Sequence, residues 1–100
     1  MQRQITELLA LGTLPSEKTA TVDQLEKVES LVVSIEKPLT KEEAEALVTV
    51  FGDDGCFGIA RSVMLLVETA PEWPIQSCLA NSQNLWVKTL TERAAGADQG

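Results

Sequence analysis

The sequence predicts an all-α protein: five to six short helices in antiparallel helical hairpins, forming a bundle or a short HEAT-like array around a buried central helix. Three observations predict this class. Apolar residues recur at three- and four-residue steps in several segments, which is the spacing of one helix face. Residues that favour helix starts and ends bracket these segments. The run from Ile59 to Val67 is apolar on almost every side, which is typical of a helix packed on several faces.

Two amphipathic helices are predicted in the N-terminal third. The first ends near Gly12, and the second runs from Val22 to about Glu36 with Thr21 as its N-cap. We expect residues 13–21 to form a connecting loop between the two helices. The second helix ends before Pro38, because the residue before a proline is pushed out of the α region. The apolar faces of the two helices are Ile5, Leu8 and Leu9, and Leu25, Val28, Leu31, Val32 and Ile35.

The third helix and the central helix follow. Thr40 and Glu43 predict a capping box that starts the third helix, and Gly52 ends it. Its buried stripe is Ala44, Leu47, Val48 and Phe51. The central helix is predicted from about Cys56 to Thr69, with Asp53 or Asp54 as its N-cap and with Phe57 as a core residue of its first turn.

The C-terminal part predicts a turn and a last helix. Pro71 and Pro74 frame Trp73, which we expect either to fold back as a lid on the core or to stand out as an anchor for a partner. One or two helical turns are predicted over residues 75–79, and Trp86 is predicted to be a core residue of the last helix. The domain spans residues 1–95, and residues 96–100 predict a frayed tail.

Acidic residues are in excess, and the excess lies in the middle of the chain. Fifteen acids against eight bases give a net charge of −7, and residues 39–73 alone carry seven acids and two bases, a net of −5. Such a surface repels nucleic acid and anionic lipid, so we expect neither as a partner. It either keeps a small domain in solution or steers a basic protein toward it. No signal peptide or spanning segment is evident, which favours a cytoplasmic protein.

Residues that could carry catalysis or bind metal are scarce. The chain has no His and no Tyr, and Cys56 and Cys78 are its only cysteines, which we expect to be reduced core residues. A helix N-terminus would lower the pKa of Cys56, but no His can act as its base. A calcium loop starting at Asp53 or Asp54 fails because its twelfth position is Met64 or Leu65 instead of Glu. We therefore predict no enzyme, no cofactor and no metal.

Part of the chain resembles a group of small all-α bacterial proteins, some of which look like immunity proteins of polymorphic toxin systems. The resemblance lies in Pro38-Leu39-Thr40, Glu43-Ala44, Phe51-Gly52-Asp53-Asp54-Gly55-Cys56-Phe57-Gly58 and Leu66-Val67-Glu68-Thr69-Ala70-Pro71-Glu72-Trp73-Pro74. It implies a cytoplasmic inhibitor that binds a cognate toxin domain and occludes it.

Charge and the loop tryptophan predict the contact residues of such an inhibitor, whose partner would be a basic toxin domain. They are Glu42, Glu45, Asp53, Asp54, Glu68, Glu72 and Trp73. The alternative hypothesis is a helical scaffold or adaptor module that dimerises or docks on a larger complex through an apolar helix face.

Overall fold

All regular elements in the described part of the chain are helical, which confirms the predicted class. The computed structural model describes residues 1–52, 54–80 and 83–99, with side chains up to residue 95. The elements are α1 (Arg3–Leu11), α2 (Val22–Ser34), α3 (Lys41–Leu47), the 3₁₀ turns η1 (Val48–Val50) and η2 (Cys56–Gly58), α4 (Ile59–Val67), the 3₁₀ turn η3 (Gln76–Leu79) and α5 (Leu85–Gln99). None of the described helices combines the length and the apolar character needed to cross a membrane.

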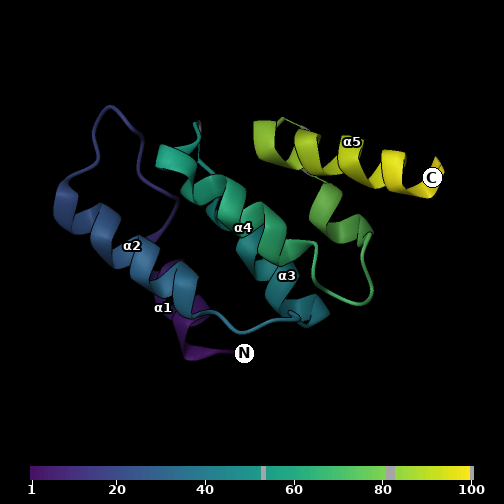
Figure 1. The fold of residues 1–100 in the computed structure, drawn as a ribbon, viewed down its shortest axis with the longest axis horizontal. Helices are drawn as coiled ribbons and strands as arrows, with labels where there is room; N and C mark the ends of the chain where they lie inside the picture. Colours follow the sequence, from purple (N-terminus) through teal and green to yellow (C-terminus); the bar gives the residue numbers. More distant parts are fainter. Residues whose placement is uncertain (53, 81–82, 100) are drawn as a thin grey trace.

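The central helix of the fold is α4 (Figure 1). It contacts α2, α3 and α5, and six of its nine residues are buried. Its exposed residues, Arg61, Ser62 and Leu65, share one side of the helix. Through the middle of the molecule α3 and α4 run in opposite directions, whereas α2 and α4 run in the same direction (Figure 1). This arrangement gives α2 and α4 a shared outer face.

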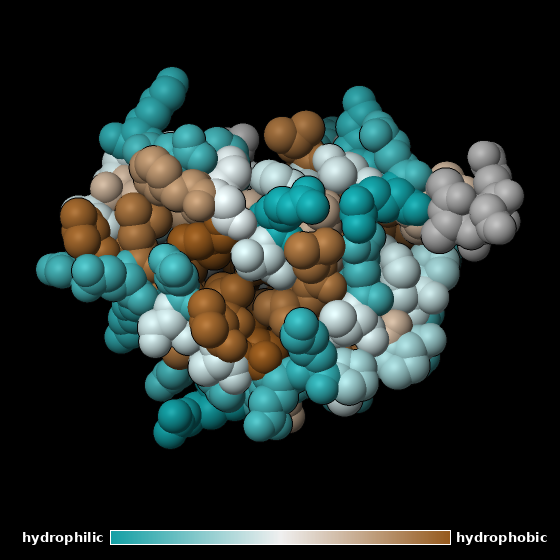
Figure 2. All heavy atoms as spheres, viewed as in Figure 1, coloured by the Kyte–Doolittle hydropathy of each residue, from teal (hydrophilic) through white to brown (hydrophobic). Residues whose placement is uncertain are grey.

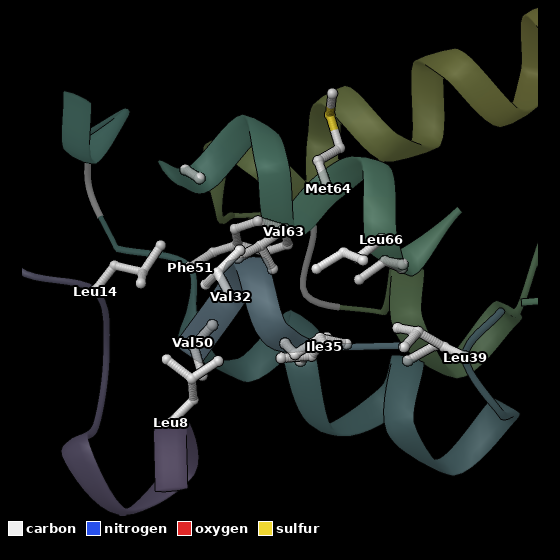
Figure 3. Close-up of a cluster of buried hydrophobic side chains, with 14 of the residues drawn as sticks. Leu8, Leu14, Val32, Ile35, Leu39, Val50, Phe51, Val63, Met64 and Leu66 are labelled. Atoms are coloured by element: carbon white, nitrogen blue, oxygen red, sulfur yellow. The ribbon is translucent and has the colours of Figure 1, made fainter. Parts of the chain in front are cut away.

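One core joins all the helices. Figure 3 shows side chains from α1, α2, the loops and α4 converging in it. The radius of gyration of 13.0 Å equals the value of about 13 Å expected for a compact domain of this length. Leu14 belongs to this core although it lies in the loop between α1 and α2, because its N–H donates to the Val50 carbonyl at 2.7 Å.

Capping boxes begin two of the helices. The Thr40 hydroxyl accepts from the Glu43 N–H at 3.2 Å, and the Glu43 carboxylate accepts from the Thr40 N–H at 2.9 Å, as predicted. The predicted cap Thr21 forms the same reciprocal pair with Gln24 at the start of α2. Glu43 also accepts from the Gln2 N–H at 3.0 Å, so its carboxylate joins the N-terminus of α1 to that of α3.

Three predicted helix ends differ from the structure. The second helix ends at Ser34 instead of Glu36, and the third ends at Leu47 before the chain tightens into η1. The central helix ends at Val67 instead of Thr69. Phe51 keeps its predicted buried position outside the helix, since it is 3% exposed. Gly52 lies where a Cβ would stand 2.8 Å from the Leu14 carbonyl oxygen, so a glycine is needed there for close approach of two loops.

The central helix starts later than the sequence predicts. It begins at Ile59, and its N-cap is Gly58, which offers no side chain, so the prediction of Asp54 as the cap is wrong. The reason lies in η2, where Cys56 and Phe57 have φ values of 45° and 52°. These left-handed values cannot continue into a right-handed helix. Asp53, the other predicted cap, lies outside the described residues.

Candidate functional site

An apolar groove lies on the shared outer face of α2 and α4. Its volume is about 390 Å³. Figure 2 shows apolar side chains gathered over the space between these helices. The apolar lining consists of Val32, Val33 and Ile35 on the α2 side and Phe57, Ile59, Leu65 and Leu66 on the α4 side. Three of these side chains remain strongly exposed: Val33 at 75%, Phe57 at 62% and Leu65 at 42%.

Phe57 stands out because its prediction as a core residue is wrong. Its backbone lies in the left-handed region, at φ 52° and ψ 37°, and Gly58 follows at φ 90°. A non-glycine residue in this region costs about 1–2 kcal/mol. This conformation places the ring beside the groove instead of in the core. Strained residues of this kind cluster at functional sites, where the surrounding structure holds them in place.

Two carboxylates hold this left-handed turn. Asp54 accepts from the Cys56 N–H at 3.0 Å, and Glu17 accepts from the Phe57 N–H at 2.8 Å. The other oxygen of Asp54 accepts from the Ser16 hydroxyl at 3.0 Å and from the Glu17 N–H at 2.9 Å. The loop between α1 and α2 is thereby tied to the loop before α4. Asp54 is a structural clamp of the turn that presents Phe57.

Trp86 supports the same loop from the other side. Its ring stacks on Phe51 with centroids 6.0 Å apart, and its Nε1–H donates to the Asp54 carbonyl at 3.1 Å. The side chain is half-buried and packs against the core, so it joins α5 to the loop before α4.

The predicted contact residues occupy several separate elements. Glu45 accepts from the Ser77 hydroxyl at 2.6 Å, and Glu68 holds Arg93 through two hydrogen bonds of 2.7 and 2.8 Å. Glu42 and Glu72 are exposed, and Asp53 lies outside the described residues. The half-buried Trp73 packs against the core, which is the lid position of the two alternatives. Several predicted contacts are therefore already engaged within the chain, and none of those that the structure describes lines the apolar groove.

Both thiols are buried and free, as predicted. Burial raises the pKa of Cys78 to about 11. Burial and the charges of Asp54 and Glu17 raise the pKa of Cys56 as well, so the expectation that a helix dipole would lower it is wrong. A raised pKa suppresses the thiolate, which is the nucleophilic form. Among the described residues no group of three or more Cys, Asp or Glu side chains is arranged to hold a metal ion.

Comparison with models of protein families, with curated protein sequences and with solved structures finds no match to this chain. Inference about its function therefore rests on its own residues.

Sequence reasoning missed the groove and its exposed aromatic residue. The apolar periodicity placed Phe57 on the buried face of a helix, because the pattern of apolar residues does not show whether a residue has a positive or a negative φ. The signal that could have revealed it is the pair of glycines Gly55 and Gly58 on either side, since flanking glycines accompany turns of unusual φ.

Strain in this turn predicts an unusual order of variant stabilities. We expect Phe57→Gly to be about 1 kcal/mol more stable than Phe57→Ala, because glycine accepts positive φ without the Cβ penalty. Both variants remove the ring, so urea unfolding of the pair measures the relief of backbone strain less the greater entropy that glycine loses on folding. Gly58→Ala should lose a similar amount of stability. Equal stability of Phe57→Gly and Phe57→Ala would show that the turn carries no strain.

Stability should decline in acid because two structural carboxyl groups have lowered pKa values. The N–H groups of Cys56 and Glu17 lower the pKa of Asp54. Burial raises the pKa of Glu43, but hydrogen bonds from Thr40 and Gln2 together lower it by more than burial raises it, so its pKa is also lowered. Such groups stabilise the fold above their unfolded pKa values, about 4. That contribution is lost as the pH falls through the lower folded values.

The measurement is the midpoint of urea unfolding between pH 6 and about pH 3, which should fall steadily below about pH 4.5. In the double variant Asp54→Asn with Glu43→Gln the slope should be shallower over the same range. If the double variant has the slope of the wild type, these two carboxylates do not govern acid stability.

Proposed function

We propose that this protein acts by binding another protein, and that the groove between α2 and α4 receives an apolar segment of that partner. The single observation that carries this proposal is Phe57: an aromatic ring 62% exposed, beside the groove, on a turn whose left-handed backbone is held by hydrogen bonds. Aromatic residues of this kind are enriched at interface hot spots. A rigid presenting turn reduces the entropy lost on binding.

The shape of the groove supports a docking role. Val33 and Leu65 are exposed on opposite sides of it, so a partner side chain placed between them would be covered from both helices. Grooves between two helices commonly take the apolar face of a third helix. This mode of binding corresponds to an adaptor module, because it uses an apolar helix face and needs no chemistry from the chain.

A second candidate function is inhibition of a toxin by an immunity protein in the cytoplasm. It is supported by the resemblance of residues 38–74 and by the net charge of −7, which favours encounter with a basic domain. Among the described residues of that part, the carboxylates of Glu42 and Glu72 are exposed. Co-expression with the product of the neighbouring gene tests this candidate, since an immunity protein must restore growth that the product suppresses.

Site-specific photo-crosslinking tests the binding proposal in cells that naturally contain the protein. A photoreactive amino acid replaces Val33 or Leu65 at the groove, and Leu85, which is 57% exposed on α5, serves as the matched control position. We expect one crosslinked protein from both groove positions and none from position 85. Adding Phe57→Asp should remove the product. Crosslinks that form equally at all three positions, or that persist in the Phe57→Asp background, would contradict the proposal.

A further inference from the structure

The charged residues of the groove identify the chemistry of its occupant. The groove carries two charged lining residues in the described part of the chain: Glu29 on α2 and Lys37 just beyond the end of α2. The helices α2 and α4 run in the same direction (Figure 1). Glu29 precedes Lys37 in the chain as Phe57 precedes Leu66, so we assign Glu29 to the Phe57 end of the groove and Lys37 to the Leu66 end. The two ends of the groove therefore have opposite charge.

Carboxylates lie around the Phe57 end of the groove. Glu17 places its carboxylate 2.8 Å from the Phe57 nitrogen, and Glu29 lines the groove on the opposite helix. Glu26 stands one turn before Glu29 and lines the adjoining surface of α2 together with Val33. An apolar occupant would meet the Glu29 carboxylate at this end, so a basic side chain there would pair with it. Anionic lipid would be repelled by the carboxylates around this end.

We infer that the occupant is an amphipathic helix of a partner protein that carries one Lys or Arg and one Asp or Glu at opposite ends of its apolar face. The basic residue pairs with Glu29 beside Phe57, and the acidic residue pairs with Lys37. Glu29 lies within α2, whereas Lys37 lies in the extended segment that follows its end at Ser34. The complementary charges of the occupant therefore lie at the two ends of its apolar face, with apolar residues between them.

This inference rests on the proposed binding function and narrows it. Apolar contact with Val33, Phe57 and Leu65 supplies the affinity, while the two charges select the partner and its register. A partner helix with the same apolar face and acid at both ends would be rejected at the Glu29 end, because like charges juxtaposed at an interface are costly.

Selection from a displayed library of helical peptides tests the inference. The library holds an apolar stripe constant and randomises the flanking positions, and the full chain serves as the target. We expect enriched peptides to carry a basic residue at one end of the apolar stripe and an acidic residue at the other. Their affinity should fall at least fivefold for the charge-exchanged variant Glu29→Lys with Lys37→Glu, and this difference should shrink in high salt. Glu29→Gln should give a smaller loss in the same direction.

The outcomes separate the inference from the function on which it rests. Enriched peptides that bind the charge-exchanged variant and the wild type equally would overturn the charge pattern, while the groove would still bind helices. Peptides whose affinity is unchanged by Phe57→Asp, or the absence of any enrichment, would overturn the binding function itself. If the chain forms a dimer that depends on Phe57 and excludes the peptides, the occupant of the groove is a second copy of the chain. If the chain binds anionic vesicles through Phe57, the groove contacts a membrane. Either result overturns the inference. Circular dichroism of each variant checks that its fold is retained.

Discussion

Replacing Trp86 with alanine is expected to lower the free energy of unfolding by about 3 kcal/mol, at the lower end of the range for large aromatic residues because the ring is half-buried. The variant loses the stacking of Trp86 on Phe51 and the hydrogen bond from Nε1 to the Asp54 carbonyl. Both contacts join α5 to the loop that leads into the left-handed turn. Urea unfolding followed by far-ultraviolet circular dichroism measures the loss without relying on tryptophan fluorescence.

Trp86→Phe is the matched control for this prediction. A phenylalanine ring can still stack on Phe51 but cannot donate to the Asp54 carbonyl, so the expected loss is about 1 kcal/mol. A Trp86→Ala variant that loses less than 1 kcal/mol would show that α5 contributes little to the stability of the domain.

Replacing Glu43 with alanine is expected to cost about 2–3 kcal/mol, from the loss of a helix cap and of charge-assisted hydrogen bonds. This side chain is only 4% exposed, and its carboxylate accepts from the N–H groups of Thr40 and Gln2. Alanine leaves both donors without this acceptor. The loss should appear as a lower urea midpoint and as faster amide exchange at the N-terminus of α1, because the bond to Gln2 ties that end of the chain to α3.

The neighbouring Glu42→Ala variant is the control, since Glu42 is exposed in the same first turn of α3. This substitution should lower the free energy of unfolding by less than about 1 kcal/mol. The loss of stability in Glu43→Gln should lie between the losses in the two alanine variants, because the glutamine amide oxygen still accepts a hydrogen bond but carries no charge. Equal losses at positions 42 and 43 would refute a structural role for the buried carboxylate.

The two proposed functions depend on different surfaces of the protein. The acidic-inhibitor hypothesis depends on carboxylates, and three of those it names already have partners within the chain: Asp54 at Ser16, Glu45 at Ser77 and Glu68 at Arg93. A binding partner would have to displace or share these contacts. The groove needs no such exchange, because Val33, Phe57 and Leu65 are exposed in the free protein. For this reason we place the main binding surface at the groove.

Local sequence signals predicted most of the secondary structure. Thr21 and Thr40 cap helices in the structure because hydroxyl caps act within three residues of themselves, so their geometry needs no distant partner. Gly12 likewise follows α1 at φ 86°. The largely apolar run in α4 correctly predicted a helix packed on several sides, since such a helix can cover its apolar surface only by burial.

Contacts between distant segments explain the predictions that failed. Phe57 has the composition of a core residue, but its exposure depends on a carboxylate forty positions earlier, Glu17, that accepts its N–H. Cys56 sits near a helix start, yet burial beside the charges of Asp54 and Glu17 raises its pKa. The hydrogen bond at Phe57 and the effect of Glu17 on Cys56 both need the loop between α1 and α2 to lie against the loop before α4, whereas Asp54 acts on Cys56 from two positions away in the sequence.

The sequence by itself determined the helical class, the N-caps Thr21 and Thr40 and the buried central helix of this protein, because these depend on periodicity and on interactions within one or two turns. Only the tertiary structure decided which apolar residues would remain outside the core. Packing α2 and α4 side by side in the same direction leaves a groove between them, and hydrogen bonds from two loops turn Phe57 toward it. The candidate binding surface results from that packing, because the exposure of a side chain depends on which helices and loops surround it and cannot be read from one helix alone.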